Sequence, residues 1–288
     1  MRQIPPDQLP INSDGSVFHL HLKPEQLADK VVMMGDPERV SIVAAYFDSI
    51  ELDLQSREFH TITGMYRGKR ITALSHGIGC DNIDIVMTEL DALANIDLQT
   101  RKVKKDFRQL TLVRIGTSGG LQPFCPIGTC VVSKISMGMD GLIFFYENGE
   151  QIVNKELFFH FIEHTRWNDL LAKPYFVPSD EELINRIGFD MIKGITISAS
   201  GFYGPQGRFV RLGLSRPDMN KLIESFDCNG LKIANYEMES AALAALAGLM
   251  GHKAMTVCLI IAGRYSGEMN TNYKTSFGVL IQKVLDRI

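Results

Sequence analysis

The stretch KVVMMGDPERVSIVAAYF, residues 30–47, changes its pattern in the middle. Its first part is a short apolar run that ends at a glycine, which predicts a buried strand. Asp36 then stands where a helix cap is expected, and Pro37 follows at the favoured first position of a helix. The stretch therefore predicts a strand, a tight turn and a helix in direct succession.

The same alternation continues along the chain and predicts an α/β fold. Strand-like apolar runs recur in residues 57–68, 69–79, 110–120, 126–134, 194–200 and 253–264. Helical spacing of apolar residues recurs in residues 81–95, 156–165, 180–187, 235–250 and 272–288. Because no repeat, low-complexity block or polar linker interrupts this order, we expect one domain over residues 17–288, preceded by an N-terminal arm over residues 1–16.

Composition excludes several classes of protein. The 288 residues are 45% hydrophobic and 22% charged, with a formal net charge of -3, which is typical of a globular protein with a large core. The densest basic run, RKVKKDFR at residues 101–108, is short and interrupted, so no nucleic-acid surface is expected. Five cysteines without a C-x-x-C pair indicate reduced thiols in a cytoplasmic protein. No signal peptide or membrane-spanning run is found, so we expect no membrane partner.

Two glycine-containing turns after predicted strands carry an arginine each. In GDPER, residues 35–39, the helix start exposes backbone N–H groups, so Gly35 and Arg39 suit an anion. In RIGTSGG, residues 114–120, small residues let a ligand approach the backbone, and Thr117 offers a hydroxyl. Arg114 needs an anionic or carbonyl partner because its strand is otherwise apolar, and an internal salt bridge explains it as well as a ligand does. Since ligands gather at the carboxyl ends of such strands, the two turns together indicate an anion site.

The loop GFYGPQGRF, residues 201–209, presents an aromatic ring, an amide and a guanidinium from Phe202, Gln206 and Arg208. Such a set can stack on a flat heteroaromatic ring and bond its edge. Ordinary turn packing accounts for the same residues equally well.

The segment NYEMESAALAALAGLM, residues 235–250, is predicted to be an alanine-rich helix headed by two glutamates. Successive helical residues are rotated by about 100°, so Glu237 and Glu239 would lie on nearly opposite faces. We expect Glu237 to face outward or to pair near the helix start, and Glu239 to point toward the sheet. An ionised carboxylate there needs several donors, which two adjacent hydroxyls of a sugar would supply.

Two other motifs are weaker. HGIGCDN, residues 76–82, has Asn82 where the third glycine of a dinucleotide-binding fingerprint would stand, so a nicotinamide cofactor is not expected. HFIEH, residues 160–164, matches the H-x-x-E-H zinc-protease pattern, in which His160 and His164 would share a helix face. Because no third ligand follows, a partly solvated helix face is the better explanation, and we expect no metal.

Five motifs occur in an order and at spacings that resemble the nucleoside phosphorylases, the family that contains uridine phosphorylase. They are GDPER, SREF, RIGTSGG, FYGPQGR and NYEMES. The similarity runs from about residue 17 to the C-terminus and is weakest between residues 135 and 193. It implies a three-layer α/β/α domain with a central mixed, partly barrel-like sheet, and a homodimer or a larger ring of dimers.

The resemblance also implies a role for each matching position. Phosphate binding is implied for Gly35, Arg39, Arg57, Arg114 and Thr117. Ribose binding is implied for His19, Thr117, Met238 and Glu239. Base binding is implied for Phe202, Gln206, Arg208 and Arg264. Of these residues, His19 and Arg57 would come from the neighbouring subunit.

The implied reaction is phosphorolysis of uridine to uracil and ribose 1-phosphate in pyrimidine salvage. The implied catalytic residues are Arg39, Arg114, Glu239, Gln206 and Arg208. Phosphate would be a co-substrate, and no metal or other cofactor is implied. Some relatives bind a monovalent cation near the glutamate that matches Glu58, but Asn82 stands where a serine ligand of that ion is found. The ion therefore stays an open alternative.

Substrate choice depends on one segment. Purine phosphorylases of the family have an aspartate after the strand that matches MTVCLII, whereas AGRYSGE, residues 262–268, has none, which favours pyrimidines. The rivals are a phosphorylase or a hydrolytic nucleosidase for another nucleoside, a catalytically silent nucleoside-binding or storage relative, and the zinc hydrolase.

Overall fold

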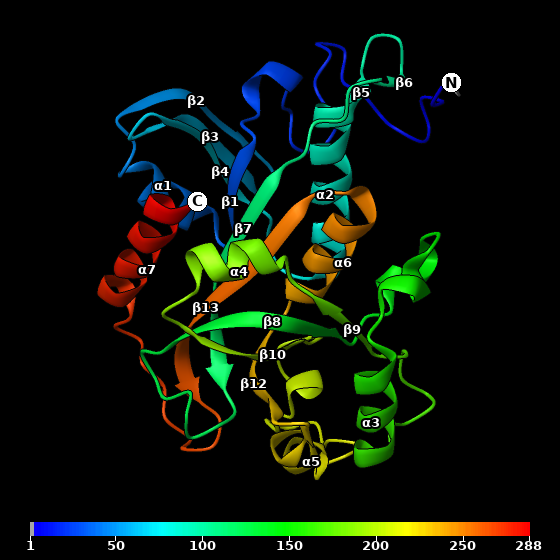
Figure 1. Ribbon diagram of the computed structural model, residues 1–288, viewed down its shortest axis with the longest axis vertical. Coiled ribbons are helices and arrows are strands. Elements are labelled where there is room, and N and C mark those ends of the chain that lie inside the picture. Colours follow the sequence, from blue (N-terminus) through cyan, green and yellow to red (C-terminus); the bar gives the residue numbers. More distant parts are fainter. Residues whose placement is uncertain (1–2) are drawn as a thin grey trace.

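The computed structural model describes residues 3–288 and shows strands and helices in alternation (Figure 1). The strands are β1 (Lys30–Met34), β2 (Ser49–Ser56), β3 (Phe59–Tyr66), β4 (Lys69–Ser75), β5 (Ile96–Asp97), β6 (Lys102–Val103), β7 (Thr111–Gly120), β8 (Cys130–Gly138), β9 (Tyr175–Pro178), β10 (Ile192–Ser198), β11 (Asp227–Cys228), β12 (Leu231–Glu237) and β13 (Lys253–Gly263). The helices are α1 (Pro37–Ala44), α2 (Cys80–Asn95), α3 (Lys155–Thr165), α4 (Glu181–Ile187), α5 (Met219–Ser225), α6 (Ser240–Met250) and α7 (Lys274–Arg287).

The main sheet is mixed and partly closed. Its order is β11-β12-β10-β8-β13-β7-β1-β4-β3-β2, with β9 beside β8. Strand β7 pairs in parallel with β1 and β13, and at its end it also pairs antiparallel with β12, where Asn235 lies opposite Gly120. The strands β7, β12, β10, β8 and β13 therefore form a closed circuit of pairings. This arrangement confirms the predicted mixed, partly barrel-like sheet.

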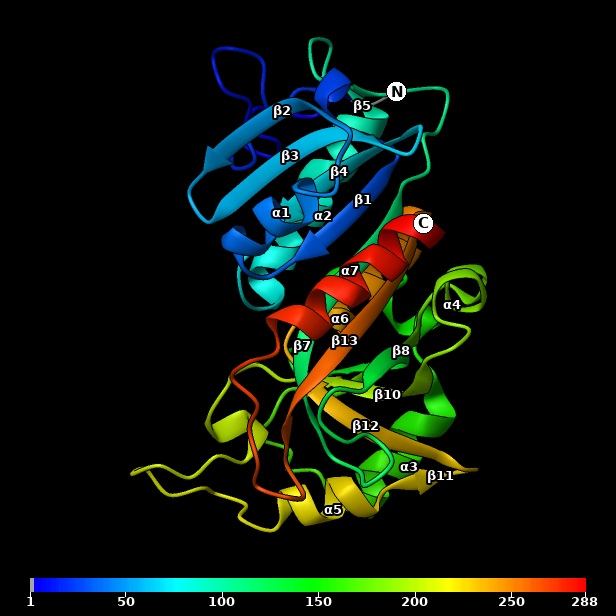
Figure 2. The ribbon, with the colours of Figure 1, turned by 90° about the vertical axis from the view of Figure 1, so that its left-hand side faces the viewer.

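Helices cover both faces of the open part of the sheet (Figure 2). Neighbouring residues of β1 point to opposite faces, as the pleat requires. Val32 packs in a core cluster with α1 and α7 residues, whereas Val31 packs in a second cluster with α2 and α6 residues. The three layers that the resemblance implies are therefore confirmed.

The predicted helix over residues 235–250 is wrong in its first part. Strand β12 continues to Glu237, and helix α6 begins only at Ser240. The cause is tertiary: Asn235 and Tyr236 pair with both β10 and β7, so the residues before the alanine run complete the closed circuit. Strands β2 and β9 were not predicted either, and β2 is largely exposed, so no buried apolar run marks it.

The predicted N-terminal arm is described from residue 3 on. The Ile4 N–H donates to the Arg101 carbonyl at 2.8 Å, and the Arg101 guanidinium donates to the carbonyls of Ile4 and Leu9. Leu9 is buried. The arm thus packs on the segment between β5 and β6.

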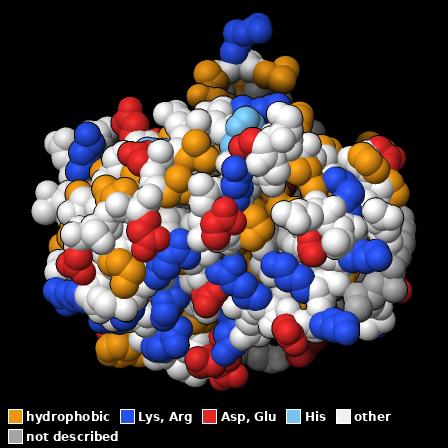
Figure 3. All heavy atoms as spheres, turned by 90° about the horizontal axis from the view of Figure 1, so that it is seen from above, with side chains coloured by type: hydrophobic (Ala, Val, Ile, Leu, Met, Phe, Trp, Pro, Cys, Tyr) orange, Lys and Arg blue, Asp and Glu red, His pale blue; other side chains and the backbone are white. Residues whose placement is uncertain are grey.

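The surface agrees with the composition. On the face in Figure 3, basic and acidic side chains intermingle. Among residues 3–288, no helix has the length and apolar character needed to cross a bilayer.

Candidate active site

A cavity of about 1030 Å³ gathers most of the predicted site residues. It is lined by the turn after β1, the outer parts of β7 and β13, the junction of β12 and α6, and the loop before α5. The predicted residues that line it are Gly35, Arg39, Arg114, Thr117, Phe202, Gln206, Arg208, Met238, Glu239 and Arg264. His19 and Arg57 are not among its lining residues.

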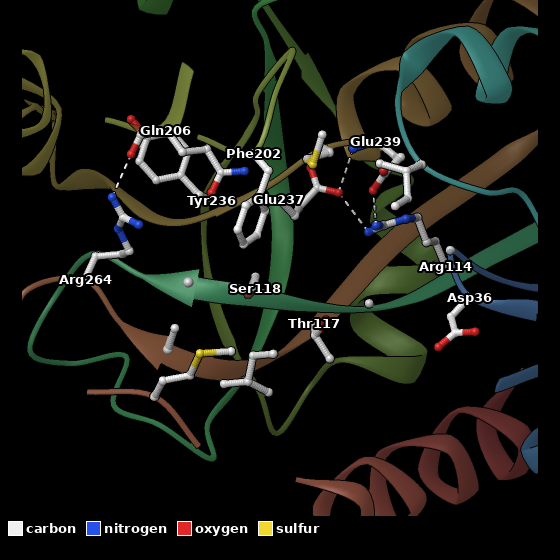
Figure 4. A pocket seen from close by; sticks show the side chains of 18 of the residues that line it. Asp36, Arg114, Thr117, Ser118, Phe202, Gln206, Tyr236, Glu237, Glu239 and Arg264 are labelled. Carbon is white, nitrogen blue, oxygen red and sulfur yellow. Dashed lines mark hydrogen bonds and ion pairs between the residues drawn. The ribbon is translucent and has the colours of Figure 1, made fainter. Parts of the chain in front are cut away.

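Arg114 lies at the centre of a buried charge cluster on β7 (Figure 4). Its Nη1 lies 2.8 Å from Glu237 Oε2, and its Nη2 bonds Glu239 Oε2. Burial lowers the pKa of the Arg114 guanidinium, but the charges of Glu237 and Glu239 outweigh burial and raise this pKa above its ordinary value. Arg114 therefore forms an internal salt bridge and also lines the cavity.

The two glutamates have different surroundings, and neither faces solvent. Glu237 accepts hydrogen bonds from the hydroxyls of Ser198 and Ser240, at 2.6 and 2.7 Å, and from the backbone N–H groups of Glu239 and Ser240. It therefore caps α6. Of the two alternatives expected for Glu237, the structure shows pairing near the helix start and not an outward position.

Glu239 lines the cavity, as Glu237 does. Its Oε1 accepts from the Gly79 N–H at 2.8 Å, and its Oε2 accepts from Arg114. Burial raises the pKa of Glu239; the Arg114 charge opposes this rise and Glu237 adds to it. The pKa of Glu239 is raised although it pairs with Arg114, because one guanidinium serves two buried carboxylates and cannot offset the desolvation of both.

The turn after β1 lies at one end of the cavity. Asp36 caps α1 by accepting from the Glu38 N–H at 2.9 Å. Arg39 on the first turn of α1 donates to the Tyr273 hydroxyl at 3.0 Å and lies 4.7 Å from the centre of the Phe277 ring. These contacts with Tyr273, the N-cap of α7, and with Phe277 of α7 hold Arg39 at the cavity. Gly35 is needed there because a Cβ would lie 3.1 Å from the Gly77 carbonyl oxygen.

The loop before α5 forms the other end. Gln206 is buried, and its side-chain oxygen accepts from Arg208, whose guanidinium lies 3.8 Å from the centre of the Phe202 ring. Arg264, which follows β13, donates to the Gln206 carbonyl at 2.7 Å. Burial and the charge of Arg264 lower the pKa of Arg208 to about 10, so the guanidinium stays charged at neutral pH. This end therefore offers a ring, an amide and two cations close together.

His19 and Arg57 form a separate group outside the cavity. The Arg57 guanidinium lies 5.5 Å from the centre of the Phe18 ring, and that ring packs edge-on against His19. His19 Nδ1 bonds Glu89 of α2 at 2.7 Å. The structure thus places the two predicted donors on either side of Phe18, and neither lines the cavity of its own chain.

The two weaker motifs have structural explanations. His164 Nε2 bonds the Leu222 carbonyl at 2.8 Å and the Ser225 hydroxyl at 3.1 Å, so it ties α3 to α5. His160 has other neighbours, Glu156 and Cys228. The two histidines of HFIEH therefore do not converge on one point as a zinc-protease pair would. Asn82 of HGIGCDN donates to the Ile78 carbonyl at 3.3 Å in the first turn of α2.

Comparison with known proteins places this cavity in context. The sequence pattern of the Phosphorylase superfamily matches residues 29–286. A uridine phosphorylase of Thermococcus kodakarensis is 29% identical over 265 residues, which are 90% of this chain and 82% of that protein. A DeoD-type purine nucleoside phosphorylase of Aliivibrio fischeri is 26% identical over 273 residues, which are 94% of this chain and 96% of that protein.

A solved structure agrees with these sequence matches. The Trypanosoma brucei nucleoside phosphorylase, described as showing uridine phosphorylase activity, superposes with a TM-score of 0.88 at 27% identity. The superposition covers 97% of this chain and 98% of that one. The likeness therefore extends over nearly the whole chain.

Proposed function

This chain belongs to the phosphorylase superfamily, and from that premise we propose that it is a pentosyltransferase that cleaves uridine with inorganic phosphate to uracil and ribose 1-phosphate. The observation that carries the proposal is the division of the cavity. Arg39 and Arg114 stand at one end, Phe202 and Gln206 with two further arginines stand at the other, and the buried carboxylates of Glu237 and Glu239 lie between them.

The phosphate would bind between the turn after β1 and β7. Gly35 offers a close approach to the backbone, Arg39 and Arg114 offer guanidinium donors, and Thr117 offers a hydroxyl. Arg114 already serves two carboxylates, so a second cation is needed to balance a phosphate dianion. Arg39, whose orientation is fixed by Tyr273 and Phe277, supplies that charge from the same chain.

The ribose would lie against Glu239 and Met238, with its adjacent hydroxyls donating to the carboxylate. The uracil would lie against Phe202, with its edge bonded by Gln206 and Arg208 and with Arg264 behind them. In the reaction the glycosidic C–N bond breaks and its electron pair leaves with the uracil. A phosphate oxygen forms the new C–O bond to the sugar carbon, and the proton that phosphate loses balances the one that uracil gains.

Catalysis would come from positioning and electrostatics. Arg39 and Arg114 hold phosphate against the sugar carbon, and the charge that builds on uracil meets Gln206 and Arg208. These groups require no metal or organic cofactor. Phosphate is a co-substrate.

The site would be completed by a second copy of the chain. His19 and Arg57 both contact Phe18 and do not line the cavity of their own chain, which supports their donation to a neighbouring site in a homodimer or larger homo-oligomer. We also place the enzyme in the cytoplasm, where free cysteines and nucleoside salvage are expected.

A change of ultraviolet absorbance tests the substrate. We expect uridine to be cleaved only when inorganic phosphate is present, and inosine to be cleaved poorly because no aspartate follows β13. Glu268 lines the cavity and is the acid that most resembles the missing aspartate. Inosine is therefore the informative control, because it shows whether Glu268 can replace that aspartate. Preferred cleavage of inosine would overturn the pyrimidine assignment, and cleavage of uridine without phosphate would indicate a hydrolase.

Gly116→Ala tests the position of Arg114 without removing it. A Cβ on Gly116 would lie 2.8 Å from Arg114 Nη1 and 2.9 Å from Cys258 Sγ, so the guanidinium has to move. We expect kcat/KM for phosphate to fall by on the order of 10²-fold, the effect of misplacing a positioning group by about 1 Å. Gly248→Ala on α6 is the matched control, since a Cβ there meets no atom within 4 Å. Equal activity of the two variants would contradict this placement of Arg114.

A further inference from the structure

Three side chains that the proposed reaction does not use meet beside α3. Glu156 and His160 stand one helical turn apart and share a face of the helix, and Cys228 comes from β11. A carboxylate oxygen, an imidazole nitrogen and a thiol sulfur all lie within 4.8 Å of one another. Figure 2 shows β11 close to α3 at the end of the molecule away from the N-terminus. We propose that Glu156, His160 and Cys228 bind a zinc ion.

The ligand chemistry favours zinc over the common hard cations. Zinc takes sulfur, nitrogen and oxygen ligands in tetrahedral sites, whereas magnesium and calcium take oxygen ligands. Zinc bond lengths imply ligand atoms roughly 3.3–3.6 Å apart. Because Glu156 and His160 are exposed, rotation about their side-chain torsions can close the remaining gap.

The surroundings also suit a bound cation. The Asn229 amide donates to Glu156 Oε1 at 3.0 Å, which orients this carboxylate from the residue next to Cys228. Cys228 is buried, and burial together with the negative charges of Glu156 and Asp227 raises the pKa of its thiol. A zinc ion would release the thiol proton and neutralise these charges, and water would fill the fourth position. Such a site would join α3 to the β11–β12 turn.

The test is zinc binding by the full chain, measured by competition with a chromophoric chelator and by metal analysis after gel filtration. We expect one zinc per chain in the wild type and a loss of affinity of at least about 100-fold in both Cys228→Ser and His160→Ala, since even a residue behind a ligand costs roughly 10–100-fold. His164→Ala is the matched control, because it removes the other histidine of the same helix, and it should keep the zinc.

Cobalt(II) gives a second, spectroscopic readout. Cobalt bound to Cys228 should give a thiolate-to-cobalt charge-transfer band, and this band should be absent from Cys228→Ser. His160→Ala should leave uridine cleavage unchanged, because the site is separate from the cavity. A wild type that binds no zinc, a missing cobalt band, or equal zinc affinity in Cys228→Ser would overturn the proposal.

A second inference comes from a different observation, the histidine behind Arg114, and it rests on the proposed function. His76 follows β4 and is buried. Its backbone N–H donates to the Met34 carbonyl at 2.8 Å, and its ring Nε2 lies 3.1 Å from Arg114 Nε. His76 therefore links the carboxyl ends of β4 and β1 to Arg114 of β7, at the end of the cavity where phosphate would bind. We infer that His76 is a positioning residue for Arg114.

The protonation state of the ring follows from its partner. Arg114 can only donate, so Nε2 of His76 has to accept and the ring proton has to lie on Nδ1. Nδ1 is buried without a partner among residues 3–288. Burial, together with the positive charge of Arg114, lowers the pKa of His76 well below 6.5, so the ring stays neutral. A neutral acceptor fixes the rotation of the guanidinium, with Nη1 on Glu237 and Nη2 on Glu239 at the cavity wall.

Two amide variants separate positioning from packing. In His76→Gln the side-chain oxygen can reach the place of Nε2, whereas in His76→Asn the oxygen stays near the place of Nδ1 and is out of reach of Arg114. Both variants bury the same chemical group. We expect the dissociation constant for inorganic phosphate, measured by calorimetry, to rise at least tenfold more in the Asn variant, with the KM for uridine little changed in either.

The outcomes separate this inference from the proposed function. Equal phosphate affinity in the two variants would overturn the role of His76 even if the wild type cleaves uridine. A wild type that binds phosphate but cleaves no nucleoside would overturn the proposed function, and the difference between the variants would still support His76. A wild type that binds no phosphate would overturn both.

Discussion

Replacing Arg114 by alanine is expected to lower phosphate-dependent cleavage of uridine by at least about 10³-fold, the upper range for loss of one preorganised donor group. The same change leaves Glu237 and Glu239 buried without their cation. Breaking a buried ion pair by removing one partner typically costs about 3–5 kcal/mol of the free energy of unfolding. Steady-state kinetics with varied phosphate, together with denaturant unfolding, measure both effects.

Two further variants separate catalysis from stability. Arg114→Lys keeps one positive charge beside the carboxylates, but its ammonium cannot reproduce the planar fork that reaches His76, Glu237 and Glu239. It should therefore recover much of the stability and little of the activity. Arg108→Ala removes an arginine that pairs with Asp29 at the surface, and it should leave kcat/KM unchanged. An active Arg114→Ala enzyme with an ordinary phosphate KM would contradict the proposed role.

Glu239→Gln is expected to lower kcat/KM for uridine by roughly 10- to 100-fold, because hydrogen bonds to a charged group contribute about 1.5–3 kcal/mol. The wild type should also lose activity as the pH falls through a pKa above the ordinary 4.5 of glutamate, since burial raises the pKa of Glu239 and a protonated carboxyl no longer accepts two hydroxyl hydrogens. A pH profile of kcat/KM measures this. The Gln variant should lack this acid limb.

Stability should respond to pH in the opposite direction at this residue. Folding raises the pKa of Glu239, so its contribution to the free energy of unfolding is fully present below pH 4.5 and is lost as the pH rises through the folded-state pKa. Glu237→Gln is the matched comparison. Its carboxylate caps α6, so this variant should lose more thermal stability than Glu239→Gln. If kcat/KM of Glu239→Gln still fell at low pH as it does in the wild type, the titrating group would be a residue other than Glu239.

Local patterns were enough to single out Gly35, Arg39 and Arg114, which the structure brings to one cavity. The predicted glycine-rich turn over residues 114–120 is wrong, because these residues belong to strand β7. Gly35 ends a short apolar strand before a capped helix, and Arg114 is a charge in a buried strand, so both stand out from their neighbours in sequence. These features could be predicted because each of them depends only on residues within one turn or one strand. The resemblance then connected these segments to the loop that carries Gln206.

Features that depend on distant pairing could not be predicted. Strand β12 ends at Glu237 because it meets both β10 and Gly120 of β7, and no local pattern records that closure. The residues just before the alanine run therefore resembled the start of the helix. His76 was missed for a related reason, since its importance comes from Arg114, 38 positions away in the chain. His19 and Arg57 lie outside the cavity of their own chain, so their proposed role can be seen only when a second copy of the chain is considered.

The central claim is that phosphate, held by Arg114, is the group that attacks the sugar. The most direct measurement is phosphorus NMR of the enzyme mixed with uridine and inorganic phosphate. The account predicts that the inorganic phosphate signal is replaced by that of ribose 1-phosphate, in step with the appearance of uracil. Uracil that appears while inorganic phosphate is unchanged and free ribose accumulates would contradict it.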